Sequence, residues 1–241
     1  MRKRINMSRK EIKEAKLADL KRAMELDPAA ESEWQIKHTY AGYKALCGYR
    51  KAHAYWEKGY KRLAELISKR VRKQTNVEIH PGAQIGKGIF IDHGAGIVIG
   101  ETTIIGDNCI IYQGVTLGGT GKQTGKRHPT LGEDVQVSAG AKILGNITIG
   151  DHSKIGANSV VIKDVPPYST VVGVPGRVVK SYGERVADMD QIKLPDPIME
   201  EFKRVHEKLE EICKKVGVDA NLYSISQDEY ITSEFDQEGN D

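Results

Sequence analysis

A six-residue repeat of branched aliphatic residues runs through the middle of the chain and constrains its fold more than any other feature. The residues at the repeated position are Ile79, Ile85, Ile91, Ile99, Ile105, Ile111, Leu117, Leu131, Val137, Ile143, Ile149, Ile155 and Val161. Six residues suit one flat face of a triangular coil, with three faces to a turn of about 18 residues. Each coil then bonds only to its neighbours, and stability builds by stacking. We therefore expect a parallel β-solenoid over residues 76–180.

The segments on either side of the repeat are predicted to be helical, which makes the fold class α+β. Residues 1–75 form the expected N-terminal helical domain, and residues 181–241 the expected C-terminal helix and acidic tail. The C-terminal helix carries apolar residues spaced alternately by four and three, namely Ile198, Phe202, Val205, Leu209, Ile212 and Val216. This stripe forms either a short coiled coil between subunits or a contact with the helix's own domain.

Composition excludes several classes of protein. Residues 1–73 hold 20 Lys and Arg against 9 Asp and Glu, but these charges are spread around the predicted helices without interleaved aromatic residues, so we expect no nucleic-acid partner. Three cysteines without CxxC spacing argue against a disulfide framework and a zinc site. No stretch approaches the roughly 18 apolar residues of a membrane helix. These features predict a cytoplasmic protein with no membrane contact.

Candidate chemistry lies where the repeat is broken. A two-residue insertion begins at Asp92-His93, and a histidine of ordinary pKa is a natural general base near neutral pH. The alternative reading is a surface-turn histidine. Glu78 precedes His93 by almost one coil, so its carboxylate could stack beside the imidazole and orient it, or could simply open the solenoid.

A longer excursion interrupts the repeat at residues 119–130. It is rich in glycine but lacks the Walker spacing of a phosphate-binding loop. Its basic end, Arg127-His128, suits a carboxylate, because a guanidinium can bind one through two hydrogen bonds. A plain solvent loop is the alternative, although loops of this length usually serve a function.

Residues 79–177 resemble the hexapeptide-repeat transferases, whose solenoid is a left-handed parallel β-helix. A closer resemblance, over about residues 20–180, rests on the motifs IHPGAQIG, DHGAGIVIGET, QGVTLGGTGK, KRHPT, GAKILGNITIG and GVPGRVV. In order and spacing these are similar to the serine O-acetyltransferases. The resemblance implies acetyl transfer from acetyl-CoA, the co-substrate, to the hydroxyl of L-serine for cysteine biosynthesis, without a metal.

The same resemblance implies roles for the site residues. His93 matches the catalytic base, and Glu78 matches its acidic partner, where better-known members carry aspartate. Substrate contacts are implied at Asp27 and Asp92, which face the serine amino group, and at Arg127 and His128, which face its carboxylate. The implied acetyl-CoA contacts are Gly119, Thr120, Ala139 and Gly140.

Assembly and partners are also expectations from the resemblance. The family is trimeric with sites between subunits, and the early position of Asp27 favours a homotrimer over a hexamer. L-cysteine is expected as a feedback inhibitor at the serine site. The chain ends in Asp241 instead of the isoleucine with which family members bind cysteine synthase, so that association is in doubt.

Three alternatives stay open at this point. A metalloenzyme of the γ-carbonic anhydrase type would use His80, His93 and His128 as ligands, although Arg127 beside His128 opposes a cation. A non-enzymatic scaffold would use the solenoid as a rigid platform. The same fold could also acetylate homoserine or a sugar, although paired carboxylates and an Arg-His pair suit an amino acid better.

Overall fold

The computed structural model describes residues 9–121, 124–181 and 197–216. It falls into two units, one ending at Pro197 and one beginning at Ile198. The expected acidic tail beyond residue 216 lies outside the described residues. The division of the chain at residues 75 and 180 stays a proposal about its organisation, because helices and solenoid share one hydrophobic core.

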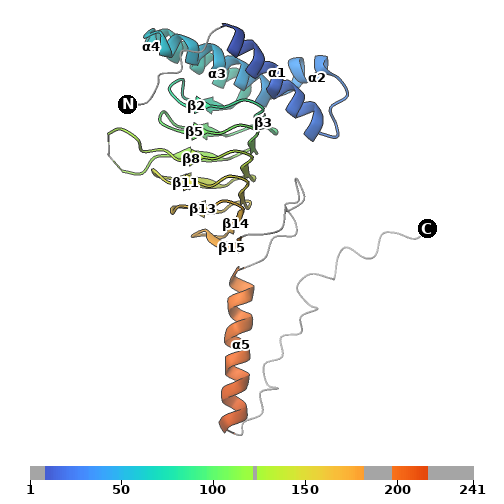
Figure 1. Cartoon of the computed structure of the whole chain (residues 1–241), viewed down its shortest axis with the longest axis vertical. Helices are drawn as coiled ribbons and strands as arrows, with labels where there is room; N and C mark the ends of the chain where they lie inside the picture. Colours follow the sequence, from blue (N-terminus) through green and yellow to red (C-terminus); the bar gives the residue numbers. More distant parts are fainter. Residues whose placement is uncertain (1–8, 122–123, 182–196, 217–241) are drawn as a thin grey trace, which may run out of the picture. The chain divides into compact units, whose positions relative to one another are not determined.

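Four helices precede the solenoid and lie together at one end of it (Figure 1). They are α1 (Arg9–Leu26), α2 (Glu33–Thr39), α3 (Ala41–Glu57) and α4 (Lys61–Thr75). The Ser32 hydroxyl accepts a hydrogen bond from the Gln35 amide at 3.2 Å and thereby starts α2. At the other end of the bundle Asn76 takes the left-handed conformation that stops α4 and turns the chain into the first strand.

Three sheets of very short strands form the faces of the solenoid. Sheet A consists of β1 (Glu78–Ile79), β4 (Val98–Ile99), β7 (Thr116–Gly118), β10 (Lys142–Leu144) and β13 (Val160–Val161). Sheet B consists of β2 (Gln84–Ile85), β5 (Ile104–Ile105), β8 (Thr130–Leu131) and β11 (Thr148–Ile149). Sheet C consists of β3 (Phe90–Ile91), β6 (Ile110–Ile111), β9 (Gln136–Val137), β12 (Lys154–Ile155), β14 (Ser169–Val172) and β15 (Arg177–Ser181).

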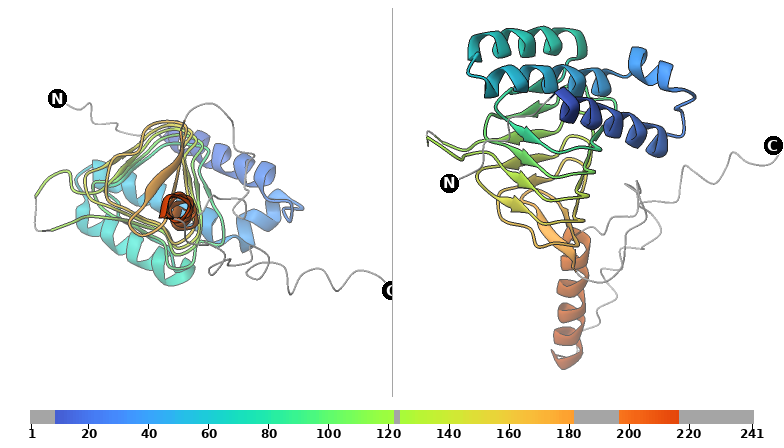
Figure 2. Two further views of the ribbon diagram at one scale, coloured as in Figure 1. Left: turned by 90° about the horizontal axis from the view of Figure 1, so that it is seen from below. Right: turned by 45° about the horizontal axis from the view of Figure 1, so that its top comes forward.

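Successive coils pair in parallel, as in a left-handed β-helix, and enclose a triangular core (Figure 2, left). Glu78 pairs with Val98, and Val98 pairs with Thr116. The two-residue insertion therefore lies in a turn at an edge, and the repeated aliphatic positions stay in register between coils. Every aliphatic residue of the repeat is buried in one core cluster. The repeat therefore predicted the inward positions correctly. At the far end β15 pairs antiparallel with β14 and ends the parallel stacking.

The helices cover the open edge of the first coil. A solenoid coil bonds to the coils on both sides, so the first one would leave its outward carbonyl groups without partners. Side chains of α3 and α4 supply those partners. The donors are Ser68 to the Ile79 carbonyl (2.7 Å), His53 to Pro81 (2.8 Å), Tyr49 to Ala83 (2.6 Å) and Arg50 to Gly86 (2.7 Å).

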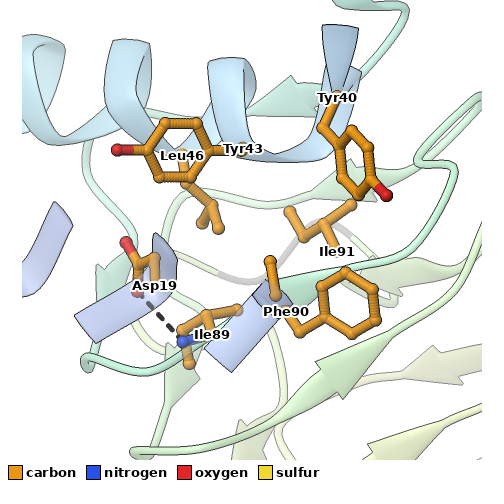
Figure 3. Close-up of a pocket in the computed structure, with 8 residues that line it drawn as sticks. Asp19, Tyr40, Tyr43, Leu46, Ile89, Phe90 and Ile91 are labelled. Atoms are coloured by element: carbon orange, nitrogen blue, oxygen red, sulfur yellow. Dashed lines mark hydrogen bonds between the residues drawn. The ribbon is translucent and has the colours of Figure 1, made fainter. Parts of the chain in front are cut away.

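A buried ion pair joins two helices to this coil. Arg50 of α3 and Asp19 of α1 are both fully buried and share two hydrogen bonds of 2.8 Å. Asp19 also accepts the Ile89 amide at 3.0 Å, the dashed bond in Figure 3, which also shows Tyr43 and Leu46 of α3 and Tyr40, the residue before that helix. Burial raises the pKa of the Asp19 carboxyl, and the hydrogen bonds and charge of Arg50 oppose that rise.

The second unit contains one described element, helix α5 (Pro197–Val216), drawn in orange to red in Figure 1. It has the expected helical form, and the apolar side chains of its stripe that the structure describes are exposed. Across the described residues, none of the helices combines the length and apolarity needed to cross a bilayer.

We expect Asp19→Asn to destabilise the folded chain by about 3–5 kcal/mol, because the Arg50 charge would stay buried without its counterion. Thermal unfolding of the full chain, followed by circular dichroism, measures the loss. The matched control is Lys37→Met, which removes an exposed pair with Glu33 and should change stability by less than about 1 kcal/mol. Equal effects of the two substitutions would contradict the anchoring role of Asp19.

Candidate active site

The three sheets meet along three edges, and the candidate residues gather on two of them. The chain passes from sheet C to sheet A at residues 92–97, 112–115, 138–141 and 156–159, which we call the C–A edge. It passes from sheet A to sheet B at residues 80–83, 100–103, 119–129 and 145–147, which we call the A–B edge. Figure 2 (left) shows the long excursion projecting from one corner of the triangle.

Asp92 and His93 begin the first turn of the C–A edge, directly after β3. His93 has a φ of 57°, and Gly94 follows with a φ of 87°, so the turn is tight and left-handed. A side chain at Gly94 would meet Val77 at 2.9 Å, which explains the glycine. The His93 side chain is 74% exposed, and its Nε2 lies 3.9 Å from Asp92 Oδ1. The imidazole is therefore open to a substrate that reaches this edge.

Asp27 reaches the same edge from the helical segment. It follows α1 directly, where its Oδ1 accepts the Ala29 amide at 2.8 Å. Its Oδ2 accepts the Tyr40 hydroxyl at 2.6 Å. Helix α3 approaches the solenoid closely here, because Gly42 has no side chain and an added Cβ would lie 2.1 Å from the Ile91 carbonyl oxygen. Asp27 thus follows the end of α1 directly and still lies beside the Asp92 carboxyl.

The electrostatics of this cluster are anionic. Burial raises the pKa of the Asp92 carboxyl; the His93 charge opposes this, and the negative charge of Asp27 adds to it. Burial and the Asp27 carboxylate together raise the pKa of Tyr40 to about 12, with a further contribution from Asp92. Two nearby carboxylates that accept hydrogen bonds form a site suited to a cationic group such as an ammonium.

Arg127 and His128 lie on the A–B edge, where the excursion returns to the solenoid. The Arg127 guanidinium pairs with Glu101 at 2.8 Å. Thr102 holds the backbone, since its hydroxyl accepts the amides of Arg127 (3.0 Å) and His128 (3.1 Å). Lys126 donates to the His128 carbonyl oxygen and closes the loop from the other side.

The protonation of His128 follows from these contacts. Its Nδ1 accepts the Thr102 amide at 3.2 Å and lies 2.9 Å from the Thr102 hydroxyl, so the ring proton belongs on Nε2. Burial lowers the pKa of His128, and the charges of Arg127 and Lys126 lower it further. A neutral ring that offers an Nε2–H beside a guanidinium is a suitable donor set for a carboxylate.

Glu78 lies on sheet A, between the two edges. Its carboxylate pairs with Arg72 of α4 at 2.8 Å. Strand pairing places it opposite Val98, while Asn76 accepts the Gly96 amide in the neighbouring turn. Within the described chain, the ion pair of Glu78 is thus with Arg72, whereas the ion pair of His93 is with Asp92.

The four residues expected to contact acetyl-CoA divide between the same edges. Gly119 and Thr120 begin the excursion on the A–B edge, where Gly119 lies close to His128 and Thr120 close to Gly145. Ala139 and Gly140 belong to the C–A edge, and Gly140 lies against Gly114 and Asn158. The described chain therefore divides the candidate residues into two groups: Asp27, Asp92 and His93 on one edge, and Arg127 and His128 on the other.

Sequence reasoning missed three residues that hold these two groups in place. Tyr40 holds Asp27, Thr102 holds Arg127 and His128, and Glu101 pairs with Arg127. Glu101 and Thr102 stand within the DHGAGIVIGET motif, at the turn one coil before the excursion, and that position was the available signal. Tyr40 carries no local signal, because its contact spans 13 residues across the α1–α3 connection.

Comparison with protein families and curated proteins gives a consistent picture. The family described as bacterial transferase hexapeptide (six repeats) matches residues 128–163. A serine acetyltransferase from Staphylococcus xylosus is 54% identical over 193 residues, which cover 80% of this chain and 89% of the relative. One from Bacillus subtilis is 51% identical over 195 residues, covering 80% and 90%.

Solved structures of the same kind are similar in fold. A serine acetyltransferase in complex with cysteine matches with a TM-score of 0.75 and 43% identity, over 77% of this chain and 73% of that one. The Neisseria gonorrhoeae enzyme in complex with serine matches with a TM-score of 0.69 and 42% identity, over 72% and 71%. A complex with CoA matches with a TM-score of 0.68 and 43% identity, over 71% of each chain.

We expect the imidazole of His128 to titrate below its ordinary value of about 6.5, as the Nε2–H tautomer. The unfolded chain binds more protons between the lowered and the ordinary pKa, so stability rises with pH across that window and is lost as the pH falls below about 6.5. Nitrogen-15 NMR of labelled histidine measures both tautomer and pKa. In Arg127→Leu the pKa should move back toward the ordinary value, because one of the positive charges that lower it is removed. An unchanged titration would contradict that cause.

Proposed function

Because this chain belongs to the serine acetyltransferase family, we propose that it transfers the acetyl group of acetyl-CoA to the hydroxyl of L-serine, giving O-acetylserine and CoA. The product serves cysteine biosynthesis, which we place in the cytoplasm. The observation that carries the proposal is the pair of carboxylates, Asp27 and Asp92, beside the exposed His93. An amino acid offers an ammonium to this pair while its hydroxyl faces the imidazole.

The proposed reaction needs a base, an acid and a positioned acceptor. His93 takes the proton of the serine hydroxyl as that oxygen attacks the thioester carbonyl of acetyl-CoA. The new C–O bond forms, the C–S bond breaks, and His93 returns the proton to the departing CoA sulfur. Binding of serine through both charged ends supplies the alignment that makes this attack effective.

Glu78 is the proposed orienting group for His93. A carboxylate next to a general base holds the imidazole and stabilises its protonated form. Glu78 pairs with Arg72, whose side chain is 61% exposed, across the surface of sheet A. A surface pair of this kind is worth about 0–1 kcal/mol, so exchange of Arg72 for the imidazolium costs little.

We propose that three copies of the chain complete the site. In a three-fold ring each subunit presents one edge to one neighbour and a different edge to the other. The C–A edge of one subunit would then face the A–B edge of the next, joining Asp27, Asp92 and His93 to Arg127 and His128. A homotrimer is the smallest such assembly, and a hexamer would be two of them.

The same interface accommodates the second substrate. Ala139 and Gly140 of one subunit would lie across from Gly119 and Thr120 of its neighbour, leaving a groove for the pantetheine arm of acetyl-CoA. A related enzyme was solved with CoA, which supports this ligand class. We also propose that L-cysteine competes with serine, because it carries the same ammonium and carboxylate and a related enzyme binds it.

The substrate assignment is tested by thiol release from acetyl-CoA with L-serine, L-homoserine and a galactoside as acceptors. We expect turnover with serine, and a fall of about 10²–10⁴ in kcat for His93→Ala. Glu78→Gln should reduce kcat less than His93→Ala does. Turnover with the galactoside alone would refute the acceptor, and near-full activity of His93→Ala would refute the mechanism.

The shared site is tested by mixing two inactive variants. His93→Ala lacks the base on one edge, and Arg127→Ala lacks the carboxylate-binding group on the other. After unfolding and refolding together, random association should restore about a quarter of the wild-type sites, because each interface joins one edge from each subunit. The control is each variant refolded alone. No recovery in the mixture would place the whole site within one chain.

A further inference from the structure

Helix α5 carries an apolar stripe that the proposed reaction does not use. Phe202, Val205, Leu209, Ile212 and Val216 are between 47% and 70% exposed. They recur with spacings of three and four, which is the heptad pattern of a coiled-coil seam, with Val205 and Ile212 at the d positions. Removing five such side chains from water is favourable, so we expect the stripe to pack against a partner.

The width of the stripe identifies the kind of partner. A helix that packs on a globular surface shows a wide apolar face, whereas a strict a and d stripe is the narrow seam of a coiled coil. Between Phe202 and Val216 the e and g positions beside the seam hold His206, Lys208, Cys213 and Lys215. In a parallel coiled coil a g residue faces the next e residue of the neighbouring helix, so Lys208 lies opposite Cys213 and no like charges face each other there.

The residue types at the seam indicate the number of helices. Parallel two-stranded coils prefer leucine at d, while Leu at a with Ile at d favours more than two strands. Here Leu209 occupies an a position and Ile212 the following d position, and Val205 is another β-branched residue at d. This pattern favours three or four strands over two.

We propose that α5 helices from three copies of this chain associate as a parallel, three-stranded coiled coil. The number three rests on the proposed assembly of the active site, in which three copies stand around one axis and face the same way. The three-fold symmetry of that assembly would make the three α5 helices parallel, with their seams in register. The partner of each α5 is therefore two further copies of itself.

Attachment to the solenoid explains how so short a coil can form. A single helix of 20 residues is marginal in water. Three helices fixed to one assembly meet at a high effective concentration, so a weak seam is occupied without much intrinsic affinity. In return the coil would hold together the subunits whose edges form the shared site.

A cysteine placed in the seam tests the proposal on the full chain. In a Cys213→Ser background, Ile212→Cys puts one thiol from each helix at the same level of the seam. The control, Lys214→Cys, puts the thiol on the outward face of the same turn, and Cys47 and Cys109 are common to both proteins. Mild oxidation and non-reducing electrophoresis measure the linked fraction.

Three equivalent thiols can form only one disulfide, so we expect Ile212→Cys to stop at about two thirds of the chains linked. Complete linking would indicate two or four strands and overturn the three-stranded coil. Equal linking of Lys214→Cys, or none at Ile212→Cys, would overturn the association of α5 itself. No linking at Ile212→Cys is the result expected if α5 packs on its own solenoid. Thiol release with serine, measured on the same variants, separates this failure from a failure of the proposed function.

Discussion

The hydrogen bonds that close the first coil are the interaction on which the rest of the structure depends. A solenoid stabilises itself by stacking, and its first coil has nothing to stack on. Arg50, buried against Asp19, reaches the carbonyl of Gly86, while Tyr49 and His53 reach those of Ala83 and Pro81. Because these donors lie on one helix, α3 is fixed in both position and rotation over the coil.

That fixed orientation produces the first half of the site. Asp19 holds α1 against the same coil, so the end of α1 lies where β3 gives way to Asp92 and His93. Asp27 directly follows α1 and its partner Tyr40 directly precedes α3, the two helices that the ion pair connects. The helical segment therefore protects the solenoid end and also contributes a charged group that no hexapeptide coil supplies.

The second half of the site arises from a break in the repeat. A regular coil presents only short turns at its edges, too small to hold a charged substrate. The excursion provides Arg127 and His128, and Thr102 in the turn below binds their backbone amides. The regular coils supply rigidity, and the irregular segments supply chemistry. Because they lie on different edges, the proposed trimer is what would unite them.

Local patterns explain how much of this could be predicted. The inward residues could be predicted from the six-residue repeat because each coil has the same local geometry. Asp92 and His93 were found because they stand at the insertion. Tyr40 and Thr102 were missed because their contacts join residues 13 and about 26 positions apart. The heptad stripe of α5 was equally visible in the sequence, since its spacing is a local property of one helix.

The sequence by itself determined the coil and its inward face, and it supplied the candidate site residues, because these depend on residue type and short-range spacing. Only the tertiary structure decided which of those side chains meet. It placed Glu78 beside Arg72, gave His128 its neutral tautomer through Thr102, and divided the candidate residues between two edges. The physical reason is that a triangular coil sends successive turns in three directions, so closeness along the chain does not imply closeness in space.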